Sequence, residues 1–98
     1  MVKHIVIWKI ADGEDKAARA EDIKKNLEAL KDKIKELRSI EVGINCIDNE
    51  YSADVVLTAE FDSKEDLGRY QENPDHKAVG QNYVRPYVKE RRVVDYEI

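Results

Sequence analysis

The chain has 98 residues, of which 39% are charged and 42% hydrophobic, and it contains only four glycines and two prolines. This length and composition predict one compact domain over residues 1–98 and exclude a disordered chain. The formal net charge is −4 at pH 7, so lysine and arginine are not in excess for binding phosphates, and we expect no nucleic-acid partner.

The distribution of apolar residues and cysteine bears on the compartment. No apolar run is long enough to cross a bilayer, and the N-terminus begins with an alternating pattern rather than a leader sequence, so we expect no membrane partner and a cytoplasmic location. Cys46 is the only cysteine, which rules out a disulfide within the chain and a cysteine-paired metal site. It ends an apolar stretch, which favours a packing role over catalysis.

The first predicted element is a β-strand. Residues 3–10 alternate in character, which places His4 and Trp8 on one face and Ile5 and Ile7 on the other. Because neither face is polar throughout, we expect both faces of the sheet to be covered.

A long helix is predicted after this strand. Apolar residues recur every three or four positions from Ala20 to Leu37 among many charged residues. This repeat spans fewer than three heptads and lies between strands. A helix packed on a sheet is therefore favoured over a coiled coil.

A β-hairpin and a short helix follow. Residues 40–46 and 55–61 alternate and are separated by a polar turn, which is typical of two paired strands. Ser63 has the position of a helix N-cap. Pro74 ends that helix, because the residue before a proline is driven out of helical geometry, and it can begin another turn.

The C-terminal part contains a second helical stretch and a last strand. Val79 and Tyr83 are four positions apart and are expected on one side of a helix that runs toward Pro86. Residues 92–96 predict the final strand. The order βαββαβ is that of a ferredoxin-like α+β fold, an antiparallel four-stranded sheet with helices on one face.

The other face of this sheet predicts a protein partner. Ile5, Ile7 and Val56 are expected there, and they would face water in a lone subunit. The simplest cover for such a face is the same face of a second copy. We therefore expect a homodimer that forms through the open sheet face.

Several segments together resemble a known family. They are VKHIVIWKI at the start, EVGINC in the middle, TAEFDSKEDLGRYQENPDH from the third strand into the helices, and VVDYEI at the end. With this combination, the chain is similar to the stress-responsive dimeric A/B barrel domain family over nearly its whole length. The resemblance implies a ferredoxin-like subunit whose sheet packs against that of its twin, forming a dimeric α+β barrel.

The resemblance also implies a set of site residues. The olivetolic acid cyclase branch of this family closes a linear polyketide thioester into an aromatic acid with a histidine, a tyrosine and a histidine on a strand. The matching positions are His76, Tyr70 and His4. No metal or organic cofactor is implied, and the asparagine, tryptophan and histidine set of haem-degrading relatives has no counterpart at suitable spacing.

Residue chemistry suggests a role for each of these positions in a catalytic site. His76 would be the base, because an imidazole exchanges a proton near neutral pH. Its place just after Pro74 puts it near exposed helix amides, whose positive potential would keep the ring neutral. Tyr70 would donate a hydrogen bond to a carbonyl that gains negative charge, and His4 would orient the substrate or the tyrosine.

Three functions remain open at this point. The first is a homodimer that binds a small, partly apolar molecule between sheet and helices, with Trp8, Val79 and Tyr83 as further ligand contacts. The second is a cofactor-independent cyclase or lyase that uses His76 and Tyr70 as an acid–base pair. In the third, a structural or interaction module of a stress response, the same side chains only pack, as buried aromatic residues and histidines commonly do.

Overall fold

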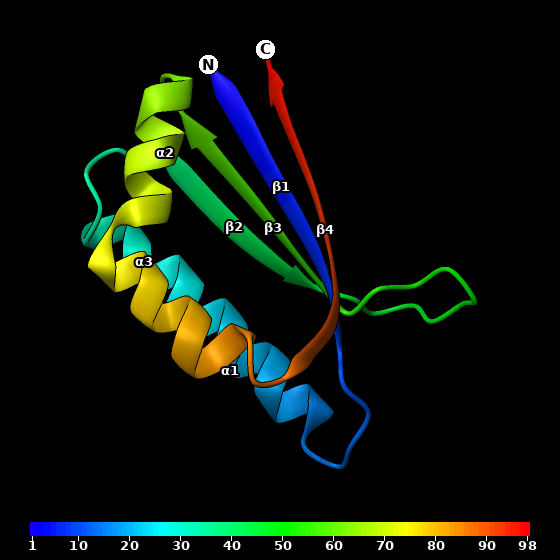
Figure 1. Cartoon of the computed structure of the whole chain (residues 1–98). Helices are drawn as coiled ribbons and strands as arrows, with labels where there is room; N and C mark the ends of the chain where they lie inside the picture. Colours follow the sequence, from blue (N-terminus) through cyan, green and yellow to red (C-terminus); the bar gives the residue numbers. More distant parts are fainter.

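A four-stranded antiparallel sheet carries all the helices on one of its faces (Figure 1). The structure is a computed structural model and describes residues 1–98. Its strands are β1 (Val2–Ile10), β2 (Ser39–Ile44), β3 (Val55–Phe61) and β4 (Val88–Glu97), and its helices are α1 (Lys16–Glu28), α2 (Lys64–Glu72) and α3 (Pro74–Val79). A 3-10 turn, η1 (Ala29–Asp32), follows α1, and a π-helical turn, η2 (Gly80–Val84), follows α3. No helix combines the length and the apolar character that a membrane span requires.

The strands have the spatial order β2-β3-β1-β4, and each neighbouring pair is antiparallel. Each of the two helical connections joins strands that lie two positions apart in the sheet: β3 lies between β1 and β2, and β1 lies between β3 and β4. This is the ferredoxin-like arrangement that the element order predicted. The two ends of the chain meet at one end of the sheet, where the Ile98 N–H donates to the Met1 carbonyl at 2.9 Å (Figure 1).

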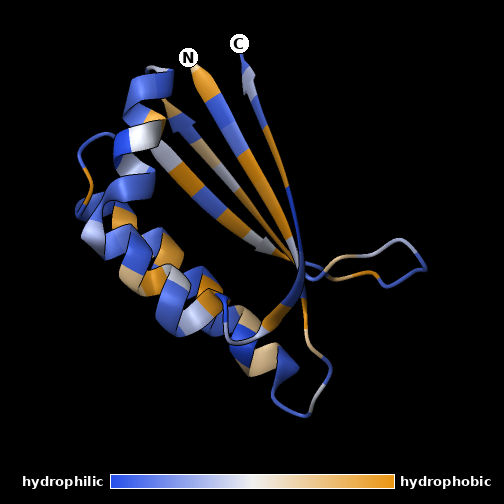
Figure 2. Cartoon of the chain, in the orientation of Figure 1, coloured by the Kyte–Doolittle hydropathy of each residue, from blue (hydrophilic) through white to orange (hydrophobic).

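The core fills the space between the sheet and the helices. Along β1 the helix-facing residues are all buried, and the intervening residues are more exposed. Figure 2 shows the same alternation as bands of apolar and polar residues along the strands. The largest fully buried apolar side chains are those of Tyr70, Phe61, Ile10, Ile23, Leu30, Ile34, Leu37, Leu57, Val6 and Val42.

The first helix is shorter than the sequence pattern predicted. Helix α1 ends at Glu28, whereas the apolar repeat extends to Leu37. Leu30, Ile34 and Leu37 are nonetheless 2% exposed or less. The 3-10 turn and the segment after it keep these side chains against the core, so the apolar repeat continues beyond the end of the α-helix.

The ends of two strands also differ from the prediction. Strand β2 ends at Ile44, and Cys46 lies exposed in the loop that follows instead of packing in a strand. This loop, residues 45–54, projects from the sheet (Figure 1). Strand β4 begins at Val88, earlier than the predicted start at residue 92, and its residues are exposed along almost its whole length.

The sheet face opposite the helices is partly apolar and uncovered, as predicted. Ile5 is half-buried there, while Ile7 and Val56 are 40% and 37% exposed. Val94 and Tyr96 on β4 extend this surface, because they pair with Ile5 and with Lys3 across the β1–β4 ladder. We refer to Ile5, Ile7, Val56, Val94 and Tyr96 as the open-face cluster.

Candidate functional site

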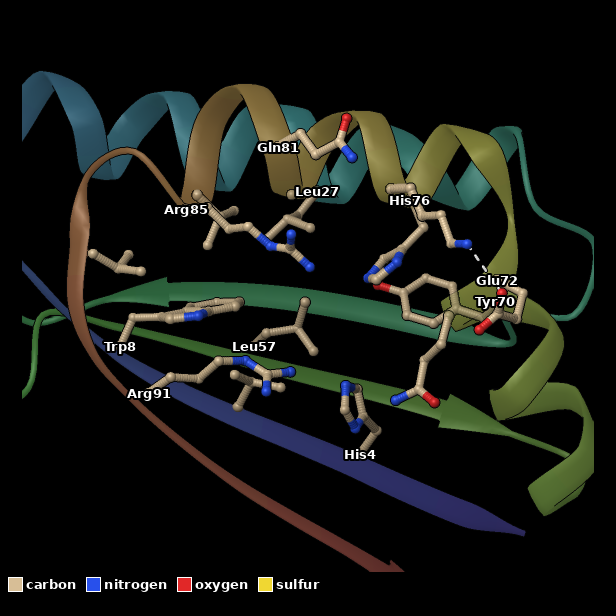
Figure 3. Close-up of a pocket in the computed structure, with 16 residues that line it drawn as sticks. His4, Trp8, Leu27, Leu57, Tyr70, Glu72, His76, Gln81, Arg85 and Arg91 are labelled. Carbon is tan, nitrogen blue, oxygen red and sulfur yellow. Dashed lines mark hydrogen bonds and ion pairs between the residues drawn. The ribbon is translucent and has the colours of Figure 1, made fainter.

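A cavity of about 510 Å³ lies between the sheet and the helical segment formed by α3 and η2 (Figure 3). Its apolar wall is drawn from β1, β3, β4, α1 and η2 and consists of Val6, Trp8, Leu27, Leu57, Val84 and Val88. Its polar wall includes all three residues that the sequence grouped, His4, Tyr70 and His76. The walls of two smaller cavities contain none of the three residues whose buried polar atoms lack a partner, Trp8, Tyr70 and His76.

Local structure brings these three residues to one place. His4 points to the helix side because it alternates with Ile5 on β1, and it is 3% exposed. Tyr70 lies in the last turn of α2 and His76 in the first turn of α3. Between them, Asn73 is extended, and its side-chain oxygen accepts from a main-chain N–H of α3 at 2.9 Å. The corner at Asn73 therefore turns two short helices so that both side chains reach the same cavity (Figure 3).

The rings of these residues form a compact cluster. The ring centroids of Tyr70 and His76 are 4.3 Å apart with a tilt of 49°, and those of His4 and Tyr70 are 6.4 Å apart at 69°. Phe61 supports Tyr70 with a centroid distance of 5.0 Å. The contact between Tyr70 and His76 is thus ring against ring, and no hydrogen bond joins the two side chains.

Three buried polar atoms of the cavity wall have no hydrogen-bond partner in the chain. They are Trp8 Nε1, the Tyr70 hydroxyl oxygen and His76 Nδ1. A buried polar group without a partner costs roughly 1–3 kcal/mol, and native proteins contain few of them. All three belong to residues that line the same cavity.

Burial alters the acid–base properties of the cluster. It lowers the pKa of His76 below its usual value, because a buried imidazolium loses hydration. The charges of His4 and Arg91 add to this lowering, and the main-chain oxygen of Gln71 opposes it. Burial also raises the pKa of the Tyr70 phenol. Both groups are therefore neutral near pH 7. The sequence predicted a neutral His76 from helix amides, but burial is the main cause.

His4 is held by a residue that the sequence pattern did not single out. Its Nδ1 pairs with a carboxylate oxygen of Asp95, and the two residues are direct cross-strand partners on β1 and β4. A carboxylate only accepts, so Nδ1 of His4 is the donor in this pair. The signal for Asp95 in the sequence was its place in the family-like segment VVDYEI.

Of the three further ligand contacts that the sequence suggested, only Trp8 lines the cavity. Val79 is buried in the core and Tyr83 is 37% exposed, and neither contributes to the wall. The cause is the π-helical turn η2, which a main-chain hydrogen bond of 2.8 Å closes over five residues instead of four. The next core-facing residue after Val79 is therefore Val84, five positions later, and the Tyr83 side chain faces outward.

A comparison with family models agrees with the fold. The family model described as Stress responsive A/B Barrel Domain matches residues 2–98. The chain belongs to this family. No curated protein matches the sequence.

Solved structures share the fold of this A/B barrel domain. A dimeric protein of unknown function with a ferredoxin-like fold from Bacteroides fragilis is 36% identical; the match covers 99% of this chain and 95% of that chain, with a TM-score of 0.89. A dimeric ferredoxin-like protein of unknown function from Thermobifida fusca is 23% identical, with coverage of 99% and 90% and a TM-score of 0.84. Hydroxynitrile lyase from Passiflora edulis is 17% identical, with coverage of 99% and 92% and a TM-score of 0.83. At these last two identities the likeness shows the fold alone.

The cavity of this A/B barrel domain also has charged groups that the sequence pattern did not reveal. Arg85, directly after η2, and Arg91, on β4, both line the wall. Lys77 lines it as well and bonds Glu72 at 3.0 Å. Nothing in a single sequence separates such residues from ordinary surface charges. No group of three or more histidine, cysteine or acidic side chains is placed to hold a metal ion.

Proposed function

We propose that this A/B barrel domain protein binds a small, partly apolar molecule in the cavity between sheet and helices. The observation that carries the proposal is the set of unpartnered buried atoms on Trp8, Tyr70 and His76 around one cavity. A volume of about 510 Å³ is within the usual range for small-molecule sites. An apolar wall with a few convergent polar groups is also typical of such sites.

The same proposal includes a homodimer that forms through the open-face cluster. Its five residues leave apolar surface in water in a single subunit. Two of the structures that share the fold are described as dimeric, and one of them is 36% identical to this chain. A two-fold arrangement covers the face with its own copy.

A fluorescent dye and a filled cavity test the binding function. N-phenyl-1-naphthylamine is neutral and brightens in apolar surroundings, so we expect saturable binding of one dye per chain. Gly80 lines the cavity in helical geometry, and a Cβ atom added there has no neighbour within 4 Å beyond its own helical turn. Gly80→Phe should therefore fill the cavity and abolish dye binding.

The matched control is Gly68→Phe. Gly68 lies in α2, outside the cavity wall, and a Cβ atom added there also has no neighbour within 4 Å beyond its own helical turn. This variant should bind the dye as the parent chain does. Equal dye binding by the parent and the Gly80→Phe variant would reject the cavity as the binding site.

A second candidate function is a cyclase or lyase without an organic cofactor. It is favoured by the neutral imidazole of His76 and the neutral phenol of Tyr70, whose ring centroids are 4.3 Å apart and whose polar atoms are free. The imidazole takes a proton from the carbon next to a carbonyl, and the phenol donates a hydrogen bond to the oxygen of the resulting enolate. The enolate carbon then attacks a second carbonyl to close a ring, and the imidazolium of His76 returns its proton to the alkoxide that forms. In the reverse direction the imidazole takes the hydroxyl proton and the carbon–carbon bond breaks.

Proton exchange separates binding from catalysis. We expect the parent chain to accelerate exchange of the α-protons of 2-heptanone with D₂O, measured by NMR. His76→Ala should lose about 100-fold or more of that acceleration, which is the usual contribution of a general base. The variant should still bind the dye. If the parent chain binds the dye but does not accelerate proton exchange, the binding function stands and the cyclase or lyase function is rejected.

A further inference from the structure

The polar groups around the cavity are mainly hydrogen-bond donors. The indole N–H of Trp8 and the guanidinium groups of Arg85 and Arg91 can only donate. Glu72 is the one carboxylate in the wall, and Lys77 already engages it at 3.0 Å. A molecule that satisfies this wall must therefore be rich in acceptors.

The two arginines approach the cavity from opposite layers. Arg91 is the cross-strand partner of Trp8 and shares its helix-facing side of the sheet, while Arg85 comes from the end of the helical layer. In Figure 3 both side chains reach into the space between Trp8 and the rings of Tyr70 and His76. The charge of Arg91 also contributes to the lowered pKa of His76, which agrees with this placement.

Neither of these arginines has an ion-pair partner in the chain. By contrast, Arg19, Arg38 and Arg69 each pair with an acidic side chain. The chain as a whole is acidic, with a net charge of −4, so carboxylates are abundant on its surface. Two unpaired guanidinium groups at one cavity are therefore a local positive site in an acidic protein.

We propose that the bound molecule is an organic carboxylate. Its carboxylate accepts from Arg85, Arg91 and the Trp8 N–H, its apolar part lies against Leu57, and a carbonyl or hydroxyl oxygen meets Tyr70. The fork of a guanidinium matches the two oxygens of a carboxylate, and this pairing is stronger than a neutral hydrogen bond. The inference rests on the proposed binding function and names the chemical class of its ligand.

Competition against the neutral dye tests the charge of the ligand. The competitors are 5-oxohexanoate, its uncharged amide 5-oxohexanamide, and butyl phosphate. We expect the carboxylate to displace the dye at a concentration about tenfold or more below that of the amide. Higher ionic strength should reduce this difference, because exposed charges are screened by salt.

The variants assign the preference to the two arginines. In the double variant Arg85→Gln with Arg91→Gln, the amide and the carboxylate should compete equally. Arg92→Gln is the matched control, because Arg92 pairs with Ile7 on the opposite face of β4, lies outside the wall and has the same charge to lose. It should keep the preference for the carboxylate. All these side chains are exposed, so the variants should keep the thermal stability of the parent chain.

Each remaining outcome has a definite meaning. Equal competition by carboxylate and amide in the parent chain overturns the inference but leaves the binding function intact, since the dye still occupies the cavity. A preference that persists in the double variant also overturns it. Butyl phosphate competing at about a tenfold lower concentration than the carboxylate would assign the positive site to a phosphate group instead. Failure of the dye itself to bind would remove the proposed function together with this inference.

Discussion

Tyr70→Phe should make the chain more stable and its ligand binding weaker. The Tyr70 side chain is 0% exposed, and its hydroxyl has no partner in the chain. A buried, unpaired hydroxyl costs roughly 1–3 kcal/mol, and we take the lower end because a polar cavity admits water. Phenylalanine keeps the ring contacts with Phe61 and His76 at 5.0 and 4.3 Å. The free energy of unfolding should therefore rise by about 1 kcal/mol, which raises Tm by about 4–8 °C in a domain of this size.

Affinity should change in the opposite direction. A ligand that accepts from Tyr70 loses one hydrogen bond in the variant, which is worth about 1 kcal/mol or roughly fivefold in Kd. Urea denaturation at one fixed protein concentration measures the stability, because dimer formation makes it depend on concentration. Displacement of the dye by 5-oxohexanoate measures the affinity.

Tyr51→Phe is the control for this pair of measurements. Tyr51 is 87% exposed in the loop after β2, so removing its hydroxyl should change neither quantity. A loss of about 1 kcal/mol or more in Tyr70→Phe would mean that the hydroxyl has a partner in the folded chain, and the reasoning would be refuted. A gain in stability without weaker binding would remove the hydroxyl from the ligand site.

Three other predictions concern pH, His4 and the dimer. His76 has a pKa below 6.5 in the folded chain and near 6.5 when unfolded, so the unfolded state takes up the proton first. Acid below about pH 6.5 should therefore destabilise the parent chain more than the His76→Gln variant, while above that pH the imidazole contributes no pH dependence. Urea denaturation of both proteins at several pH values measures this difference. An equal loss of stability in acid would contradict a buried neutral imidazole. Asp95→Asn should lower the free energy of unfolding, measured by urea denaturation, by about 1 kcal/mol, because it removes a charge-assisted hydrogen bond to His4. This value is at the low end for such bonds because the Asp95 side chain is 39% exposed. An unchanged stability and an unchanged NMR signal of the His4 ring would exclude that pair. Ile7→Glu should weaken the dimer at least about 30-fold in sedimentation equilibrium, because two symmetry-related copies each lose about 1 kcal/mol of apolar burial. A dimer of undiminished affinity would show that the open face is not the interface.

Much of the fold could be predicted because it depends on local periodicity. The alternation along β1 was enough to place His4 with the core and Ile7 on the open face, since a strand allows only two directions. The end of α1 could not be predicted in the same way. Leu30 and Leu37 continue the apolar spacing, and no glycine or proline interrupts it, so the change to a 3-10 turn leaves no local mark in the sequence.

The candidate site was predictable only in part, because it depends on contacts between distant segments. His76 and Tyr70 are close in sequence and share one helical corner, so family-like spacing was informative. Asp95 meets His4 across 91 positions, and only the register of β4 against β1 determines that meeting. Arg85 and Arg91 occupy a helix end and an edge strand, where a charged residue is ordinary. Their shared cavity exists only in the folded chain.

The π-helical turn gives this fold a simple way to change its ligand. The turn contains one more residue than an α-helical turn would need, and Arg85 follows it directly. Loss of a single residue within Gly80–Val84 would turn the helix end at Arg85 by about 100° relative to α3. A different side chain would then take the place of Arg85 at the cavity. A one-codon deletion or insertion can thus change the charge at one end of the cavity in one step, while Tyr70 on α2 and His4 on β1 keep their places in its wall.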